Sequence, residues 1–114
     1  MKAYTDLEQS KKLAEILPLE SADMYLDYNV HCQKYKYYLR VMDDQFDDVC
    51  IPCWSLAALI KVLPSIEGFK PVIDLDINQI RYEGKYRDEL YFDSENLIDA
   101  CYEMILKLHE QNLL

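Results

Sequence analysis

Glycine is scarce in this sequence, and its scarcity excludes several classes of protein. Gly68 and Gly84 are the only glycines among 114 residues. Nucleotide-binding loops need glycines at fixed spacings because the backbone must approach the phosphates closely. Neither the G-x-G-x-x-G pattern nor the P-loop pattern can be written with two glycines this far apart. The chain is therefore neither a Rossmann-type dinucleotide-binding enzyme nor a P-loop nucleotidase.

Long apolar runs and basic residues are also in short supply. No run approaches the roughly 20 apolar residues of a membrane span, and Met1–Asp6 contains no apolar signal core. The 12 basic residues are outnumbered by 21 acidic residues, which gives a formal net charge of -9. Such a charge repels nucleic-acid phosphates and anionic lipids. We expect a cytoplasmic protein that binds neither nucleic acid directly nor membranes, and whose charge serves either solubility or attraction of a basic partner.

Histidine is limited to His31 and His109, so no general base is placed beside a serine nucleophile. His109 lies near the end of a predicted helix, where an imidazolium stabilises the helix dipole. His31 and Cys32 could join Cys50 and Cys53 as zinc ligands, but adjacent residues seldom reach the same ion. The sequence favours a non-enzymatic protein with no metal and no cofactor.

The Cys50-Ile51-Pro52-Cys53 motif is the one short pattern that could support a reaction. A C-x-x-C at a helix start lowers a thiol pKa, and proline before the second cysteine is typical of thioredoxin-like sites. The preceding Asp47 and Asp48 disfavour a thiolate, and the order of elements differs from a βαβ unit. A thiol-disulfide oxidoreductase using Cys50 and Cys53 is therefore an alternative hypothesis. The simpler interpretation is that Cys53 and Trp54 pack where a helix enters the core.

Two segments in the first half of the chain have apolar residues at helical spacing. The first begins with a capping box, in which Thr5 is the N-cap and Glu8 follows three residues later, and it ends before Pro18. The second covers Pro52–Val62, with Ser55 as cap or Pro52 in the first turn. Both predict short amphipathic helices.

The clearest helical pattern lies near the end of the sequence. Asp93 or Ser94 can cap it, and the pattern continues to His109. Its apolar positions recur at helical spacing and predict a face that is buried in a core. These positions are Leu97, Ile98, Cys101, Met104, Ile105 and Leu108.

Other segments alternate apolar and polar residues with a period of two, which predicts strands. In the third of them, Ile73, Leu75 and Ile77 are expected to face inward, before a turn at Asn78-Gln79. Short connections between successive strands favour antiparallel pairing. We predict one α+β domain over residues 1–114, with a mostly antiparallel sheet of about five strands, three amphipathic helices on one face, and the order α-β-β-α-β-β-β-α. The predicted strands are Met24–Val30, Lys34–Val41, Ile73–Ile77, Ile80–Glu83 and Leu90–Phe92.

Ten tyrosines stand out in the composition, and many fall on predicted strands. Tyrosine suits half-buried strands, which is the simplest explanation, but it is also a favoured contact residue at interfaces. Three tyrosines fall on the outward phase of their strands, together with three aspartates, and predict a surface for a basic protein on the open face of the sheet. The predicted surface consists of Tyr25, Asp27, Tyr38, Asp74, Asp76 and Tyr91.

Three stretches, Tyr4–Pro18, Ile51–Leu59 and Asp99–Leu108, together carry a resemblance that spans most of the chain. They resemble an uncharacterised family of short proteins from gut anaerobic bacteria, often encoded near phage or mobile-element genes. The resemblance implies a bacterial cytoplasm and a mobile-element setting, and it assigns no activity or site residue. We therefore expect an acidic, non-enzymatic interaction protein of a mobile element or phage. The alternatives are the thiol oxidoreductase and a structural module with no specific ligand.

Overall fold

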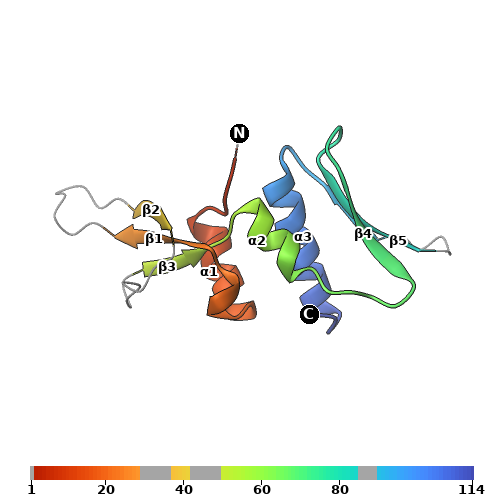
Figure 1. Ribbon diagram of the computed structural model, residues 1–114, viewed down its shortest axis with the longest axis horizontal. Helices are drawn as coiled ribbons and strands as arrows, with labels where there is room; N and C mark the ends of the chain where they lie inside the picture. Colours follow the sequence, from red (N-terminus) through yellow and green to blue (C-terminus); the bar gives the residue numbers. More distant parts are fainter. Residues whose placement is uncertain (1, 29–36, 42–49, 85–89) are drawn as a thin grey trace.

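The computed structural model describes residues 2–28, 37–41, 50–84 and 90–114, and it places three helices between two small sheets (Figure 1). This arrangement confirms the α+β class. The helices are α1 (Leu7–Ile16), α2 (Leu56–Val62) and α3 (Leu97–Glu110), with a short 3-10 turn at Leu19–Ser21. The strands are β1 (Met24–Tyr28), β2 (Tyr37–Val41), β3 (Cys50–Cys53), β4 (Phe69–Asp74), β5 (Gln79–Gly84) and β6 (Leu90–Asp93).

The predicted single sheet of five strands is wrong, because the strands divide into two antiparallel sheets with the orders β2-β1-β3 and β4-β5-β6. One difference lies at Cys50–Cys53, because Pro52 and Cys53 were expected to begin a helix and instead belong to the strand β3. This strand pairs with β1 from Met24↔Cys53 to Asp27↔Cys50. The pairing completes the first sheet before the chain enters α2. The later strands form the sheet β4-β5-β6 at the other end of the molecule (Figure 1).

The start of α1 differs by one residue from the predicted capping box. Asp6 is the N-cap: its Oδ1 accepts from the backbone N–H of Gln9 at 2.8 Å, and Gln9 Oε1 accepts from the N–H of Asp6 at 3.1 Å. Thr5 is buried instead, and its Oγ1 accepts from the backbone N–H of Trp54 at 3.1 Å. A buried hydroxyl needs a partner, so Thr5 joins the start of α1 to the end of β3.

The other two helices also begin later than predicted. Ser55 caps α2, which confirms one of the two helix starts predicted from the sequence. Pro52, the other predicted start, lies in β3. Asn96 caps α3 in place of Asp93 or Ser94, and its side chain accepts from the N–H of Asp99. Each helix therefore begins at a side chain that satisfies an amide without an intrahelical partner.

The core lies around α3, which packs against α2, β5 and β6, while α1 packs against β3. The predicted apolar face of α3 is confirmed, because all six of its residues are at most 9% exposed. Trp54 is completely buried in the same core cluster, and its Nε1 donates to Ser21 Oγ at 3.0 Å. In the described part of the chain, no helix has the length and apolar character needed to cross a membrane.

Candidate interaction surface

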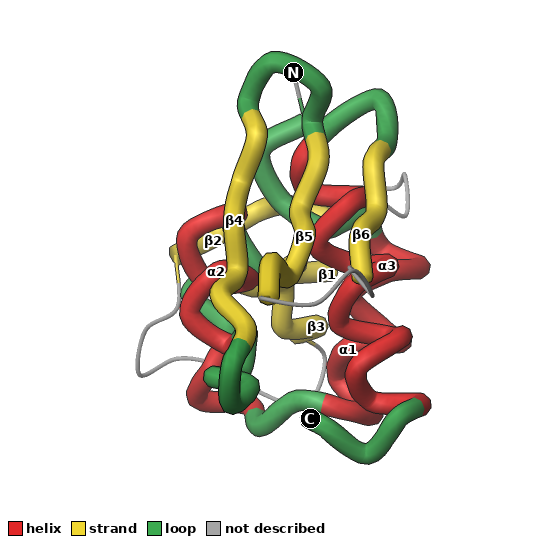
Figure 2. The backbone as a smooth tube through the Cα atoms, turned by 90° about the vertical axis from the view of Figure 1, so that its right-hand side faces the viewer, coloured by secondary structure: helices red, strands yellow, loops and turns green. Residues whose placement is uncertain are grey.

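The sheet β4-β5-β6 has one face against α3 and one face that no other described element covers (Figure 2). In an antiparallel sheet, residues directly opposite one another point to the same face. Ile73, Ile80 and Phe92 form one cross-strand row and belong to the core, so the alternate rows face outward. We name these outward residues the open face: Lys70, Val72, Asp74, Gln79, Arg81, Glu83, Tyr91 and Asp93.

Arg81 lies at the centre of the open face and is held by polar neighbours. Its Nε donates to Glu83 Oε1 at 2.7 Å, and its Nη1 donates to Gln79 Oε1 at 3.1 Å. The same Nη1 is 3.6 Å from Asp74 Oδ2. The guanidinium charge is therefore largely offset by the carboxylates of its own sheet.

Among the described residues on and beside the open face, acidic side chains outnumber basic ones. Asp74, Glu83 and Asp93 are opposed by Lys70 and Arg81, and Asp76 adds a further carboxylate in the turn that follows Asp74. This excess of carboxylates among the described residues favours a negative potential over the open face.

Tyr91 is the aromatic residue of the open face, and its side chain is 56% exposed. It lies opposite Arg81, which lies opposite Val72 on the next strand. The outward positions predicted for Tyr91 and Asp74 are therefore confirmed, and Asp76 is exposed in the turn after β4. This cross-strand row combines an aromatic ring, an apolar side chain and a paired cation.

Tyr25 does not face outward as predicted, because its side chain is only 1% exposed. The adjacent Leu26 is 7% exposed, although neighbouring strand residues point to opposite faces. Both faces of β1 are therefore covered at this point, and alternation along the sequence could not show this.

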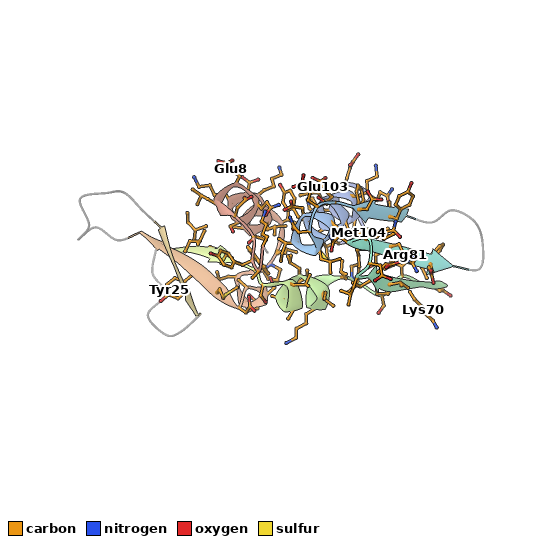
Figure 3. All side chains as sticks on the ribbon, turned by 90° about the horizontal axis from the view of Figure 1, so that it is seen from above. Glu8, Tyr25, Lys70, Arg81, Glu103 and Met104 are labelled. Carbon is orange, nitrogen blue, oxygen red and sulfur yellow. The ribbon has the colours of Figure 1, made fainter. Side chains whose placement is uncertain are left out.

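The remaining predicted contact residues lie with Tyr25 on the first sheet. Asp27 pairs with Tyr38 between β1 and β2, but both side chains lie outside the described residues. Figure 3 shows Tyr25 and Arg81 at opposite ends of the molecule. The six residues predicted to form one surface are thus divided between two sheets, and only Asp74, Asp76 and Tyr91 are brought together.

Cys50 and Cys53 both lie in the strand β3, in which Cα atoms three residues apart are separated by roughly 10 Å. A disulfide needs a Cα separation of roughly 4.4–6.8 Å. Burial and, to a smaller extent, the negative charge of Asp23 together raise the pKa of Cys53 to about 12. Burial also raises the pKa of Cys101 to about 11. Both described thiols are therefore protonated and inaccessible at neutral pH, unlike a reactive thiolate.

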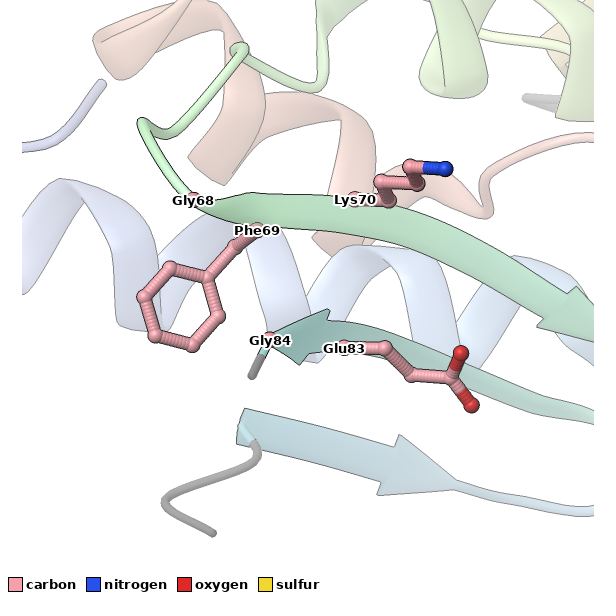
Figure 4. Close-up of a pocket in the computed structure, with 5 residues that line it drawn as sticks. All are labelled: Gly68, Phe69, Lys70, Glu83 and Gly84. Atoms are coloured by element: carbon pink, nitrogen blue, oxygen red, sulfur yellow. The ribbon is translucent and has the colours of Figure 1, made fainter. Parts of the chain in front are cut away.

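A hollow at the end of β4 and β5 is lined by Gly68, Phe69, Lys70, Glu83 and Gly84 (Figure 4). The Phe69 ring packs so closely on Gly84 that a Cβ there would lie 2.6 Å from its Cδ1. Lys70 and Glu83 extend away from the ring (Figure 4). The described residues of this lining include no nucleophile paired with a base.

Within the described ranges, no three His, Cys, Asp or Glu residues are placed to hold a metal ion. His31 and Cys32, which the zinc hypothesis requires, lie outside the described residues, as does the side chain of Cys50.

Two exposed residues beside the open face were not predicted from the sequence. Leu75 and Ile77 were expected to face inward, but they are 74% and 52% exposed because β4 ends at Asp74 and the turn occupies 75–78. The signal was available in Asp74, Asp76 and Asn78, since these residue types favour turns.

Comparison with known proteins returned no matching family model, no matching curated protein and no matching solved structure.

Proposed function

We propose that this chain is a non-enzymatic interaction module that binds a basic protein through the open face of β4-β5-β6. The observation that carries the proposal is Tyr91, a half-exposed aromatic side chain on an uncovered sheet face with an excess of carboxylates. Tyrosine contributes large contact area at low entropic cost, and carboxylates guide a basic partner during encounter. The resemblance to short mobile-element proteins makes the bacterial cytoplasm the setting in which to seek that partner.

The described thiols give the oxidoreductase hypothesis no support, because Cys53 is buried and its pKa is raised to about 12. A matched experiment separates the two functions. Cys50→Ser/Cys53→Ser is expected to retain the partner of the open face, whereas an oxidoreductase would lose its mixed-disulfide partners in this variant.

The direct test is affinity capture from cells of the native host, followed by quantitative mass spectrometry of the bound proteins. Tyr91→Ala and the double variant Asp74→Asn/Asp93→Asn are compared with wild type. Tyr4→Ala is the matched control, because Tyr4 is 36% exposed and lies outside the open face.

A basic protein should be enriched with wild type and with Tyr4→Ala, and depleted about tenfold or more with Tyr91→Ala. Its capture by wild type should fall as salt rises, because screening weakens the attraction of the carboxylates. Equal capture by Tyr91→Ala and Tyr4→Ala would contradict the proposal. Capture of no specific protein under any condition would favour the structural-module hypothesis.

A further inference from the structure

The turn between β4 and β5 presents two large aliphatic side chains to solvent. We name residues 75–78 the hairpin tip. Leu75 is the most exposed large hydrophobic residue in the described part of the chain, and Ile77 is also more than half exposed. Single exposed apolar residues are common on protein surfaces, but here two large ones occur within one four-residue turn. The hairpin tip is therefore an apolar projection at the edge of the open face.

The hairpin tip is held in one conformation by hydrogen bonds at both ends. The backbone N–H of Asp76 donates to Asp74 Oδ1 at 3.0 Å. Asn78 adopts a φ of 49°, which asparagine tolerates better than most residues, and its Nδ2 donates to the carbonyl of Glu95 at 3.1 Å. The N–H of Ser94 also donates to the carbonyl of Asn78 at 3.3 Å. These bonds tie the hairpin tip to the segment that precedes α3, so little conformational entropy remains to be lost on binding.

The charges around the hairpin tip select the kind of partner. Asp74 and Asp76 flank Leu75, and Glu95 lies in the segment that the tip contacts. Because carboxylates flank its apolar side chains, the hairpin tip is repelled by anionic lipid. It is complementary to an apolar cleft that is surrounded by basic residues. Charge complementarity therefore favours a basic protein over a membrane.

We infer that the hairpin tip is the apolar anchor of the interaction, with Leu75 and Ile77 inserted into an apolar cleft of the basic partner. The inference rests on the proposed function and assigns the anchoring role within that function to the tip. In this arrangement the open face and Tyr91 flank the anchor, while the carboxylates meet the basic rim of the cleft. The residues of the tip need no rearrangement to bind, since the turn already presents both side chains.

Photo-crosslinking in the native host tests the inference directly. A benzophenone amino acid is placed at Leu75, at Ile77 or, as control, at Leu19, which is 48% exposed in the 3-10 turn that precedes β1. Positions 75 and 77 should capture one common basic protein, and position 19 should not. Equal capture from all three positions, or capture of lipid at 75 and 77, would overturn the inference.

The captured protein is then purified and its affinity measured by calorimetry. The double variant Leu75→Ala/Ile77→Ala should bind at least about tenfold more weakly than wild type, while Leu19→Ala should bind equally well. Asn78→Gly tolerates the positive φ but removes the amide bond to Glu95, so we expect about threefold weaker binding. Unchanged thermal midpoints in these exposed variants would show that the losses are not losses of folding.

The outcomes separate the inference from the proposed function. Loss of the partner in Tyr91→Ala but not in Leu75→Ala/Ile77→Ala would overturn the anchor and leave the open face as the binding site. Loss in Leu75→Ala/Ile77→Ala but not in Tyr91→Ala would support the anchor and remove Tyr91 from the interface. Retention in both variants would contradict both the anchor and the open face. Sedimentation with anionic phospholipid vesicles in place of protein binding would also overturn the anchor.

Discussion

The two sheets have the same number of strands and the same antiparallel pairing, but they differ in how their central strands are covered. In β1, the adjacent residues Tyr25 and Leu26 are both buried, although they point to opposite faces. In β5, burial alternates: Ile80 and Tyr82 are buried, and Glu83 is exposed. One sheet is therefore enclosed on both faces at its centre, whereas the other keeps an open face.

This difference in burial shows that residue type alone does not identify a contact surface. Tyr25 and Tyr91 both occupy strand positions that alternate with apolar residues, yet one is 1% exposed and the other 56% exposed. The distinction depends on which faces of each sheet the rest of the fold covers. The polar decoration of β4-β5-β6, with Arg81 bonded to its neighbours, is consistent with a face that remains in water.

The largest effect is expected when a tyrosine side chain is removed from each sheet and the two losses of stability are compared. Tyr25→Ala should lower the free energy of unfolding by about 3–4 kcal/mol, because it leaves a cavity in an enclosed strand. Tyr91→Ala should change it by less than about 0.5 kcal/mol, because the ring is largely in solvent. Denaturant unfolding of both variants measures the difference. Equal losses of unfolding free energy would show that the two sheets do not differ in coverage. Tyr25→Phe is the control for loss of the hydroxyl group alone.

A smaller effect is expected where β4 and β5 end. Gly84→Ala should destabilise the protein by about 1–3 kcal/mol, because the added methyl group collides with the Phe69 ring and forces it to move. Gly68→Ala has open space but a φ of +80°, so we expect about 1 kcal/mol from backbone strain. Combining Gly84→Ala with Phe69→Leu should recover part of the loss. No recovery would mean that the Phe69 contact is not the cause.

A network of polar side chains joins α1, which packs on the first sheet, to α3, which packs on the second. Asp99 accepts from Lys2 Nζ at 2.7 Å, from Gln9 Nε2 at 2.8 Å and from Asn96 Nδ2 at 2.9 Å. Partial burial acts to raise the pKa of Asp99, but the hydrogen bonds outweigh it and hold the pKa below 3.8. Partial burial likewise acts to lower the pKa of Lys2, and its bonds to Asp99 and Asp6 outweigh that effect, so the pKa lies above 10.5.

The direction of the pKa shift of Asp99 determines how the free energy of unfolding depends on pH. Because the folded pKa of Asp99 is lowered, its stabilisation is present above pH 3.8 and is lost as pH falls through the folded value. Asp99→Asn should cost about 1 kcal/mol at neutral pH, and the gap from wild type should narrow in acid. Urea unfolding from neutral pH to about pH 3 measures this, with the exposed Asp93→Asn as control. A gap that widens in acid would contradict the assignment.

The smallest effect is expected on the open face itself. Arg81→Ala removes bonds to Glu83 and Gln79, but a pair near solvent contributes only about 0.5 kcal/mol to the free energy of unfolding. The loss should shrink further in high salt, because the ion pairs are screened. Thermal unfolding with and without salt tests this prediction. A loss as large as that of Tyr25→Ala would show that Arg81 supports the core and that its face is not free for a partner.

Local patterns predicted the elements better than their assembly. The apolar face of α3 could be found because its six core positions repeat at helical spacing, and Ser55 could be found as a cap because it precedes an apolar helical run. The strand at Cys50–Cys53 could not be found, because a four-residue segment beside a helix has no distinct period and is stabilised by its pairing with β1. The turn at 75–78 was missed although Asp74, Asp76 and Asn78 favour turns, because its apolar residues alternate as they do in a strand.

The amino-acid sequence by itself determined the α+β class, the absence of glycine-rich phosphate loops and the net charge of -9, because these depend on composition and short-range periodicity. Only the tertiary structure decided that the strands form two sheets, that Tyr25 is enclosed while Tyr91 is open, and that Leu75 and Ile77 project from a fixed turn. The physical reason is that alternation reports which side chains share a face of a strand. Whether that face is covered depends on contacts between residues distant in the chain.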